Sequence, residues 1–549
     1  MLSPELLDNM EKGFYLINSN LNKKITICVD PDLDGFTSSA ILYLYLKRYK
    51  PDINIDYLIP EAKAHGLEQW SDYFSESKKC DLIICPDSSS NDYDYHKKLC
   101  EMGYDILVLD HHMAEKYSEH AVVINNQLSK EYENKCLSGV GVVYKFLQYC
   151  DKNFGVSYAD NYLDLVSVGE TGDMVNLNTL ENRFIIDYGL NNIKNPGLKG
   201  LLREQGYSIY KVSKEAVTDS FIQNTPITQI NIAFYIAPLV NALIRVGTQT
   251  EKELLFRAFI EGDVIVPSTK RGHTGEEETI AEQNARNCTN ARSRQNKEKE
   301  RASELLDIQI SNDCLDDNKI LILNSDELNI KNTMTGLVAM DISSKYKKPV
   351  MLGKTNSDGI LKGSARGRGE TELKDFRNFL LSSNLIDYAE GHPNSFGVGI
   401  KVSNIDKLIK YANEKLEDVN FNEGFYEVDF ICNGNCSYLK NLIFDLDKGK
   451  FLYGQNNPEP LILVNEIPIN SNSYDIVGAR KDTVRINYNG IIFIKFFAKD
   501  LIEELENNKG KKINMNIVGK PNVNEWRGNY TPQILIDGYE LKEQSIYDF

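Results

Sequence analysis

Residues 106–112 read Ile-Leu-Val-Leu-Asp-His-His, so one carboxylate and two imidazoles directly follow a short apolar run. The apolar run predicts a buried strand. Polar groups at the end of such a strand are costly to bury unless they bind something, and a metal ion suits this combination best. Because histidine pairs also occur by chance, Asp110, His111 and His112 need support from elsewhere in the chain.

Three further segments supply carboxylates. Two of them follow apolar, strand-like runs at 25–29 and 82–85, and the third lies farther along the chain. The carboxylates are Asp30, Asp32, Asp34, Asp87 and Asp173. Because open α/β sheets bind ligands at the carboxyl ends of their strands, we expect these groups to gather at one edge of a parallel sheet.

The four segments, in this order, resemble the DHH phosphoesterase superfamily, whose members bind two divalent cations and hydrolyse phosphoester or phosphoanhydride bonds. More of the chain narrows the resemblance to RecJ-type single-strand exonucleases. The matching segments are 138–145 (SGVGVVYK), 181–183 with 188–190, 238–245 (PLVNALIR), 363–366 (GSAR), and 391–393 (GHP) with Gly397. The chain departs from the family pattern at Leu239, Ile244 and Glu390.

The resemblance implies a site for two metal ions. Asp32 and Asp34 would bind different ions, and Asp87 would bridge them. His111 and Asp173 would complete the second site. Two cations about 3.5–4 Å apart can activate a nucleophile and neutralise charge on the leaving oxygen of a phosphodiester. Mixed carboxylate and imidazole ligands favour Mn²⁺, and Mg²⁺ can substitute. Any one of these residues could instead be an ordinary loop or core-edge group, but the whole ordered set favours the metal site.

Further residues have implied roles beside the metals. His112 would face the phosphate and stabilise the transition state or assist the leaving group, while Asp110 and Asp30 would orient the ligands. Cys28 stands where the family commonly has a histidine, four residues before the first ligand aspartate. A thiolate could bind the first metal, although hard cations favour oxygen and nitrogen. The interpretation we favour is a small buried residue beside a metal with fewer protein ligands.

Two arginines, Arg245 and Arg366, resemble those that RecJ-type enzymes direct at substrate phosphates. A guanidinium group suits phosphate geometry, and Ser364 can donate a further hydrogen bond. The segment around Gly391 and His392 could line the same cleft, with a structural turn as the alternative. The predicted substrate-binding set is completed by Ser138, Gly139 and Asn241.

Alternating strands and helices predict an α/β protein with several domains. In the N-terminal part of the chain, this alternation predicts a mostly parallel sheet with helices on both faces. We expect a DHH catalytic domain at 1–260, a helical connector at 261–317, a smaller α/β domain of the DHHA1 type at 318–420, and an all-β barrel of the OB type at 424–549. The charge-rich stretch 272–306 predicts a long solvated helix, with a connector that helps to clamp DNA as the alternative.

The composition restricts the class of protein. With 549 residues, two to four globular domains are expected. No uninterrupted apolar run approaches about 18 residues, so we expect a cytoplasmic protein without a membrane partner. The ten cysteines are scattered, and the lone C-x3-C of Cys432 and Cys436 predicts reduced thiols, not a zinc site. A net charge of −17 argues against a protein that coats nucleic acid, but not against a nuclease with a local basic channel.

The function predicted is a metal-dependent 5′→3′ exonuclease that acts on single-stranded DNA in repair, recombination or replication. A single-strand-binding protein or a helicase is a further candidate partner. Polarity and DNA preference follow from the resemblance alone. In the barrel, four aromatic residues could stack on bases, although most are expected in the core. These are Tyr488, Phe493, Phe496 and Trp526.

Two alternatives compete with this function. One is a short-oligonucleotide or cyclic-dinucleotide phosphodiesterase, or a pyrophosphatase, with the same two-lobed core. Such enzymes end after that core, so the additional C-terminal barrel favours a polymer substrate. The other alternative is an inactive replication scaffold of the DHH lineage, which would have lost its ligands, whereas every acidic ligand persists here.

Overall fold

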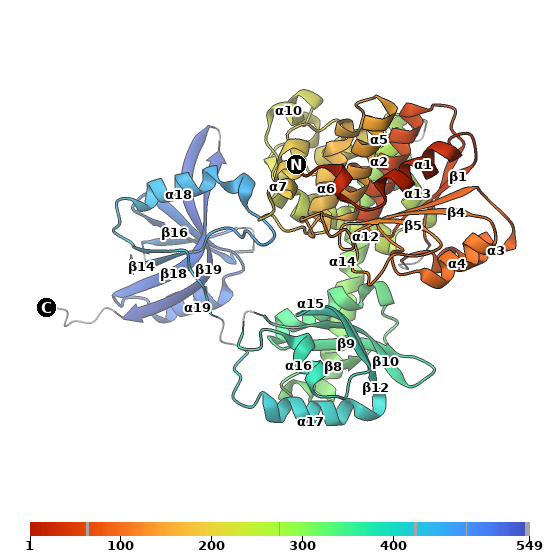
Figure 1. Ribbon diagram of the computed structural model, residues 1–549. Helices are drawn as coiled ribbons and strands as arrows, with labels where there is room; N and C mark the ends of the chain where they lie inside the picture. Colours follow the sequence, from red (N-terminus) through yellow and green to blue (C-terminus); the bar gives the residue numbers. More distant parts are fainter. Residues whose placement is uncertain are drawn as a thin grey trace. The chain divides into compact units, whose positions relative to one another are not determined.

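The computed structural model describes residues 1–61, 65–273, 275–369, 371–421, 425–470, 472–478, 480–526 and 528–543 (Figure 1). The chain forms two compact units. The first comprises Met1–Val175, Phe184–Ile227 and Asn231–Phe425, and the second comprises Asn176–Arg183, Thr228–Ile230 and Tyr426–Phe549. The β-rich C-terminal region therefore forms a unit together with two short segments from earlier in the chain.

The first unit begins with a five-stranded, all-parallel sheet in the order β2-β1-β3-β4-β5. Its strands are β1 (Ile25–Cys28), β2 (Ile55–Leu58), β3 (Leu82–Pro86), β4 (Asp105–Asp110) and β5 (Val122–Asn125). Nearly every residue of β1, β3 and β4 is buried, because helices cover both faces of the sheet. The predicted parallel sheet is confirmed.

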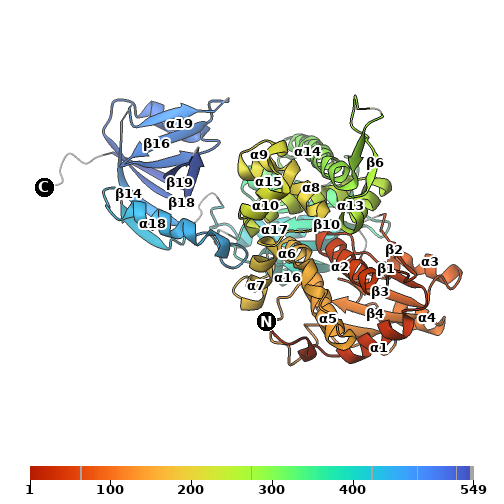
Figure 2. The same ribbon diagram turned by 90° about the horizontal axis from the view of Figure 1, so that it is seen from above.

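Two groups of helices sandwich this sheet (Figures 1 and 2). The helices of one face are α1 (Met10–Asn20), α2 (Leu33–Tyr49) and α5 (Gly139–Phe154), and those of the other are α3 (Ser71–Glu76) and α4 (Tyr93–Glu101). Helix α6 (Leu163–Gly172) packs against α2 and α5. The apolar cluster beneath α3 and α4 includes Phe74, Leu99 and the side chain of Cys28.

Helices fill the next part of the chain. They are α7 (Leu180–Leu190), α8 (Pro196–Glu204), α9 (Gly206–Tyr210), α10 (Asp219–Asn224), α11 (Gln229–Asn231), a π-helical turn at Ile232–Ile236, α12 (Ala237–Val246) and α13 (Gln249–Glu261). Among the described residues, one stretch, Gln229–Val246, has the length and mean hydropathy (1.4) of a membrane span. Half of this stretch is buried inside the protein, and α12 packs against α13 and against the helix that follows.

The connector differs from the solvated helix predicted over 272–306. A hairpin of β6 (Ile265–Pro267) and β7 (Glu277–Thr279) occupies its start. Helix α14 (Ile280–Asn312) begins only after it, because Thr279 and Glu282 form a capping box. The first half of α14 buries Ala285, Cys288 and Ala291 against α8, α12 and α13. Small apolar residues let this part of a charge-rich helix enter the core.

A second sheet of the first unit follows α14, in the order β11-β12-β10-β9-β8. Its strands are β8 (Leu321–Asn324), β9 (Val350–Thr355), β10 (Ile360–Arg366), β11 (Tyr388–His392) and β12 (Ser395–Lys401), and its helices are α15 (Thr335–Tyr346), α16 (Phe376–Ser382) and α17 (Ile405–Lys415). Only the β8–β9 pair is parallel among these strands. This smaller α/β lobe was predicted, whereas the boundaries drawn around it remain a prediction.

The second unit contains a seven-stranded sheet in the order β13-β14-β18-β19-β17-β16-β15. The strands are β13 (Phe430–Asn433), β14 (Ile462–Ile469), β15 (Tyr474–Val477), β16 (Thr483–Tyr488), β17 (Ile491–Lys495), β18 (Ile513–Trp526) and β19 (Asn529–Glu543), with helices α18 (Leu439–Lys448) and α19 (Lys499–Asn507). The predicted β-rich domain is confirmed, although two strand pairs are parallel. The alternation of apolar and polar residues in this part of the sequence did not predict helix α18.

The four aromatic residues proposed for base stacking have different surroundings in this unit. Phe493 is fully buried, and Tyr488 packs on the core and donates a hydrogen bond to Asn435. Phe496 is exposed. The side chain of Trp526, like Arg527 beside it, lies outside the described residues.

Candidate metal centre

The predicted metal ligands lie at the carboxyl ends of β1, β3 and β4, where the parallel sheet directs them to one edge. Asp32 caps α2, and its Oδ1 accepts a hydrogen bond from the backbone N–H of Gly35 at 3.0 Å. Asp34 lies in the first turn of the same helix. Asp173 follows the end of α6, which packs against α2 and so brings this distant residue to the site.

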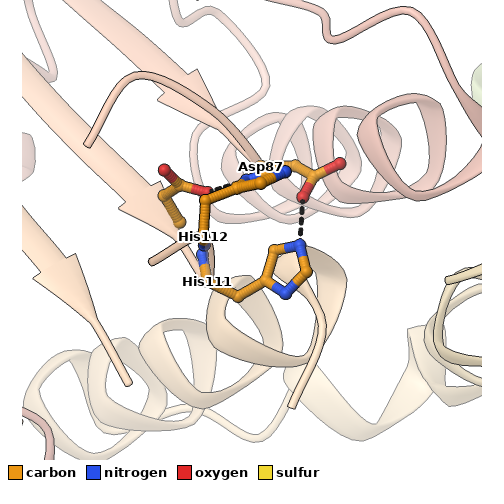
Figure 3. Close-up of side chains that lie close together, drawn as sticks. Asp87, His111 and His112 are labelled. Atoms are coloured by element: carbon orange, nitrogen blue, oxygen red, sulfur yellow. Dashed lines mark hydrogen bonds and ion pairs between the residues drawn. The ribbon is translucent and has the colours of Figure 1, made fainter. Parts of the chain in front are cut away.

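His111 lies between two of the predicted carboxylate ligands. Its Nε2 is 3.3 Å from Oδ1 of Asp87, and its Nδ1 is 3.7 Å from Oδ2 of Asp173. Figure 3 shows the imidazole turned toward the Asp87 carboxylate. Asp87 itself has a positive φ of 63°, a left-handed conformation that most residues avoid and that is often found at functional sites.

Among the described residues, potential ligand atoms gather in three overlapping groups, in each of which all atoms lie within 4.8 Å of one another. One contains Asp34, His111 and Asp173, and another contains Asp30, Asp32 and Asp87. The third joins Asp87 to Asp110, His111 and His112. Asp87 is thus shared between groups, as a bridging ligand would be.

Without bound cations, so many buried carboxylates close together are unfavourable in their ionised form. Burial, followed by the nearby charges of Asp34 and Asp32, raises the pKa of Asp87 well above its usual range. Burial and Asp32 raise the pKa of Asp34 to about 7, and burial and Asp34 raise that of Asp173 to about 8. Among the described residues, Oδ1 of Asp30 and Oδ1 of Asp87 are buried and accept no hydrogen bond, although Nε2 of His111 lies 3.3 Å from the latter. Divalent cations would relieve both the repulsion and the missing contacts, so the donor set fits a metal centre.

Asp110 orients the two histidines that follow it. Its Oδ1 accepts the backbone N–H groups of His111 and His112 at 2.8 and 3.2 Å, and its Oδ2 accepts that of Ser90 at 3.0 Å. The Nδ1 of His112 lies 2.8 Å from Oδ1 of Asp110. Burial lowers the pKa of His112, but the contact with Asp110 outweighs it and raises that pKa to about 9. Burial and then His112 lower the pKa of His111 to about 4, so His111 is a neutral imidazole able to bind a cation.

The start of α5 holds Asp34 in place. The carboxylate accepts the backbone N–H groups of Gly139 at 2.7 Å and Val140 at 2.9 Å, and the Ser138 hydroxyl at 3.3 Å. A Cβ on Gly139 would lie 2.2 Å from Oδ1 of Asp87, so only glycine lets the helix come this close. Ser138, predicted as a substrate-binding residue, is fully buried behind Asp34.

Sequence reasoning overlooked one histidine and left Cys28 open. His65 has Nδ1 2.7 Å from Oδ2 of the buried Asp30, although nothing in its local sequence pattern indicates this. Cys28 is 3% exposed and lies in the apolar cluster beneath α3 and α4. Burial and then Cys85 raise the pKa of the Cys28 thiol well above its usual range. Cys28 joins none of the three ligand groups found among the described residues.

Two predicted phosphate-binding arginines, on different lobes of the first unit, lie within electrostatic range of each other. Arg245 lies on α12 and Arg366 on β10. Burial and then Arg245 lower the pKa of Arg366, whereas the charge of Asp32 partly offsets the effect of burial on Arg245. Two neighbouring guanidinium groups repel each other, and an anion between them would remove that cost.

The other predicted substrate residues lie on the same elements or on β11. Ser364 on β10 is hydrogen-bonded to Thr335 at 3.0 Å, and Asn241 lies one turn before Arg245 on α12. Gly391 (φ 129°) and His392 form the exposed end of β11. The Gly391 carbonyl accepts a hydrogen bond from Arg377.

Comparison with known proteins finds relatives that match nearly all of this chain. Residues 24–169 match the DHH family, N-terminal domain, and residues 441–538 match the RecJ OB domain. A protein of Bacillus subtilis (strain 168), "Putative SPbeta prophage-derived single-strand DNA-specific exonuclease YorK", is 36% identical over 98% of this chain and 90% of its own length. The single-stranded-DNA-specific exonuclease RecJ of the same strain is 26% identical over 96% of this chain and 62% of its own length.

The fold is shared with a solved structure. RecJ from Thermus thermophilus in complex with Mn²⁺ gives a TM-score of 0.70 at 19% identity, covering 98% of this chain and 72% of that one. The Mg²⁺ complex from the same organism gives a TM-score of 0.64, also at 19% identity, covering 98% and 71%. At 19% identity, these two matches show a shared fold.

Proposed function

Because this chain belongs to the RecJ family of DHH phosphoesterases, we propose that it is a metal-dependent exonuclease that degrades single-stranded DNA in the 5′→3′ direction. The relatives named as single-strand DNA-specific exonucleases supply the substrate class. The family resemblance supplies the polarity and a place in DNA repair, recombination or replication. A single-strand-binding protein or a helicase that delivers the strand is a further proposed partner.

The observation that carries this proposal is the meeting of three carboxylates and one imidazole at the carboxyl edge of the parallel sheet. Asp34, His111 and Asp173 form one compact group, and Asp87 lies 3.3 Å from the shared histidine. The related Thermus thermophilus RecJ structures are complexes with Mn²⁺ and with Mg²⁺, which supports a divalent cation as cofactor here.

We assign one ion to Asp34, Asp87, His111 and Asp173, and a second ion to Asp32 and Asp87. The pair of Mn²⁺ ions, for which Mg²⁺ can substitute, supplies Lewis-acid stabilisation of the phosphate and a nucleophile at neutral pH. With Cys28 in the apolar cluster, the ion at Asp32, which is the first metal of the sequence-based prediction, would have fewer protein ligands. Asp110 and Asp30 would orient the ligands of the site.

The remaining side chains bind and position the strand. The His112 imidazolium is held by Asp110 through Nδ1, and its Nε2 would donate a proton or a hydrogen bond to a phosphate oxygen. Arg245 and Arg366 bind phosphate as charged forks, and Ser364 adds a hydroxyl. Gly391 and His392 contribute to binding of the same DNA strand.

The proposal is tested with single-stranded DNA labelled at either end, incubated with the protein and Mn²⁺. Mononucleotides should be released from the 5′ end first, duplex DNA should persist, and chelation should stop the reaction. Asp87→Asn serves as the matched inactive protein. Equal attack on both ends, or cleavage that persists in Asp87→Asn, would contradict the proposal.

The two competing functions make different predictions in the same assay. A short-oligonucleotide or cyclic-dinucleotide phosphodiesterase would act on those substrates and spare long strands. A scaffold would bind DNA without cleaving it. Neither of these two functions is favoured by the C-terminal β-rich unit or by the presence of all the acidic ligands.

A further inference from the structure

A buried glutamate lies beside the metal centre without being one of its predicted ligands. Glu170 occupies α6 one turn before Asp173 and is fully buried. Its Oε1 accepts the backbone N–H of Ser138 at 3.3 Å. Its Oε2 is buried and has no hydrogen-bond partner among the described residues. A carboxyl group in this position is costly, so its retention calls for a specific role.

The contact with Ser138 places Glu170 at the start of α5, which is the part of the protein that holds Asp34. Three successive residues there contribute: Ser138 donates its backbone N–H to Glu170, while Gly139 and Val140 donate theirs to Asp34. The Ser138 hydroxyl also reaches Asp34. Glu170 and Asp34 therefore accept hydrogen bonds from the same turn of α5.

The surrounding glycines fit this arrangement closely. A Cβ on Gly141 would lie 2.1 Å from Oε1 of Glu170, and a Cβ on Gly169 would lie 2.9 Å from Oδ1 of Asp34. Both glycines let α5 and α6 approach until the carboxyl groups meet the helix start. Loss of the Glu170 carboxyl would leave the Ser138 N–H without its acceptor and open space beside Gly141.

We propose that Glu170 is a positioning residue of the metal centre, which fixes the start of α5 and through it the orientation of Asp34. This inference rests on the proposed role of Asp34 as a metal ligand. Burial and then the charge of Asp34 raise the pKa of Glu170 well above its usual range.

The test compares three substitutions by direct titration with Mn²⁺, measured by electron paramagnetic resonance or calorimetry without DNA. Glu170→Gln keeps an oxygen acceptor and the size of the side chain, so its Mn²⁺ affinity should stay close to that of the parent. Glu170→Met keeps the size but removes the acceptor, and its affinity should fall by about 10-fold or more. Ser167→Ala is the matched control, because Ser167 is buried on the same helix and its hydroxyl donates to the Asp164 carbonyl within that helix.

Each possible result of the Mn²⁺ titration either supports or overturns the inference about Glu170. An unchanged affinity in Glu170→Met would overturn the inference, and so would an equal loss in Glu170→Gln, which would make the carboxylate charge itself the requirement. If Glu170→Met does not fold, as judged by circular dichroism, Glu170→Ala replaces it with the same expectation. A parent protein that fails to bind Mn²⁺ would overturn the inference together with the metal centre. A parent that binds Mn²⁺ but does not cut single-stranded DNA would contradict only the proposed function.

Discussion

The imidazole of His112 rests on the buried carboxylate of Asp110, with Nδ1 2.8 Å from Oδ1, and its side chain remains half-exposed. The ring nitrogens of the preceding His111 pair instead with Asp87 and Asp173. Two adjacent histidines thus have different partners, because the backbone at the end of β4 turns sharply around one carboxylate.

These different partners predict different effects of the same substitution. His112→Gln should lower the cleavage rate about 100-fold or more, because a charged donor to the phosphate is lost, and should leave Mn²⁺ affinity almost unchanged. His111→Gln should lower both quantities. Single-turnover cleavage and Mn²⁺ titration of the two proteins provide the comparison. An equal loss of Mn²⁺ affinity in both would assign His112 to the metal as well.

Asp87 combines a proposed bridging role with a left-handed backbone (φ 63°). Asparagine tolerates this conformation, so Asp87→Asn should fold normally and lose essentially all activity. Asp87→Ala should lose activity too and should cost about 1–2 kcal/mol more in stability, because the left-handed conformation is unfavourable for alanine. Thermal unfolding separates the two effects. A folded Asp87→Asn protein with more than a trace of activity would rule out the bridge.

Cys28 lies in the apolar cluster with Phe74 and Cys85, so it should contribute to stability and not to metal binding. Cys28→Ala should leave the Mn²⁺ dependence of the rate unchanged. Cys28→Ser should lower the free energy of unfolding by about 1–3 kcal/mol, because it buries a hydroxyl among apolar groups. A large loss of Mn²⁺ affinity in Cys28→Ala, or a preference of the parent for cadmium, would indicate a thiolate ligand.

Arg366 should bind the strand through phosphate alone. Arg366→Ala should weaken binding similarly for all base sequences and reduce the slope of log affinity against log salt concentration by about one. Arg366→Lys should restore only part of the affinity, since an ammonium group lacks the planar fork. Arg368, which donates to the Ser343 carbonyl, provides a nearby arginine as control. A loss that depends on base sequence would argue against a phosphate contact.

The sequence predicted the parallel sheet and the edge at which its ligands meet, because apolar runs and the acidic residues after them follow local rules. It could not place His65 on Asp30 or Glu170 on Ser138, since those contacts join segments 35 and 32 positions apart. It also predicted a solvated helix where α14 is partly buried. There the small residues Ala285 and Ala291 carry little hydrophobic signal, yet they allow close packing.

The exposed aromatic pair Phe496 and Phe497 offers a test of strand binding by the second unit. Their side chains are 55% and 82% exposed, and Phe497 has a positive φ of 52°, so the turn after β17 holds two large apolar rings in solvent. Stacking of a base on an aromatic ring is worth about 1–3 kcal/mol, so Phe496→Ser and Phe497→Ser should each weaken binding of a long single strand about 5-fold or more. Tyr207, which is 75% exposed on α9 of the first unit, provides the control substitution Tyr207→Ser.

The length of the DNA distinguishes stacking from a general loss of stability. Cleavage of a very short oligonucleotide, which occupies the metal centre alone, should proceed in the two phenylalanine variants at the rate of the parent. Degradation of a long strand should become less processive, because the strand dissociates more often between cuts. If both variants degrade long strands as processively as the parent does, these rings do not contact DNA. Tyr530, which is 61% exposed at the start of β19 in the same unit, would then be the next aromatic residue to substitute.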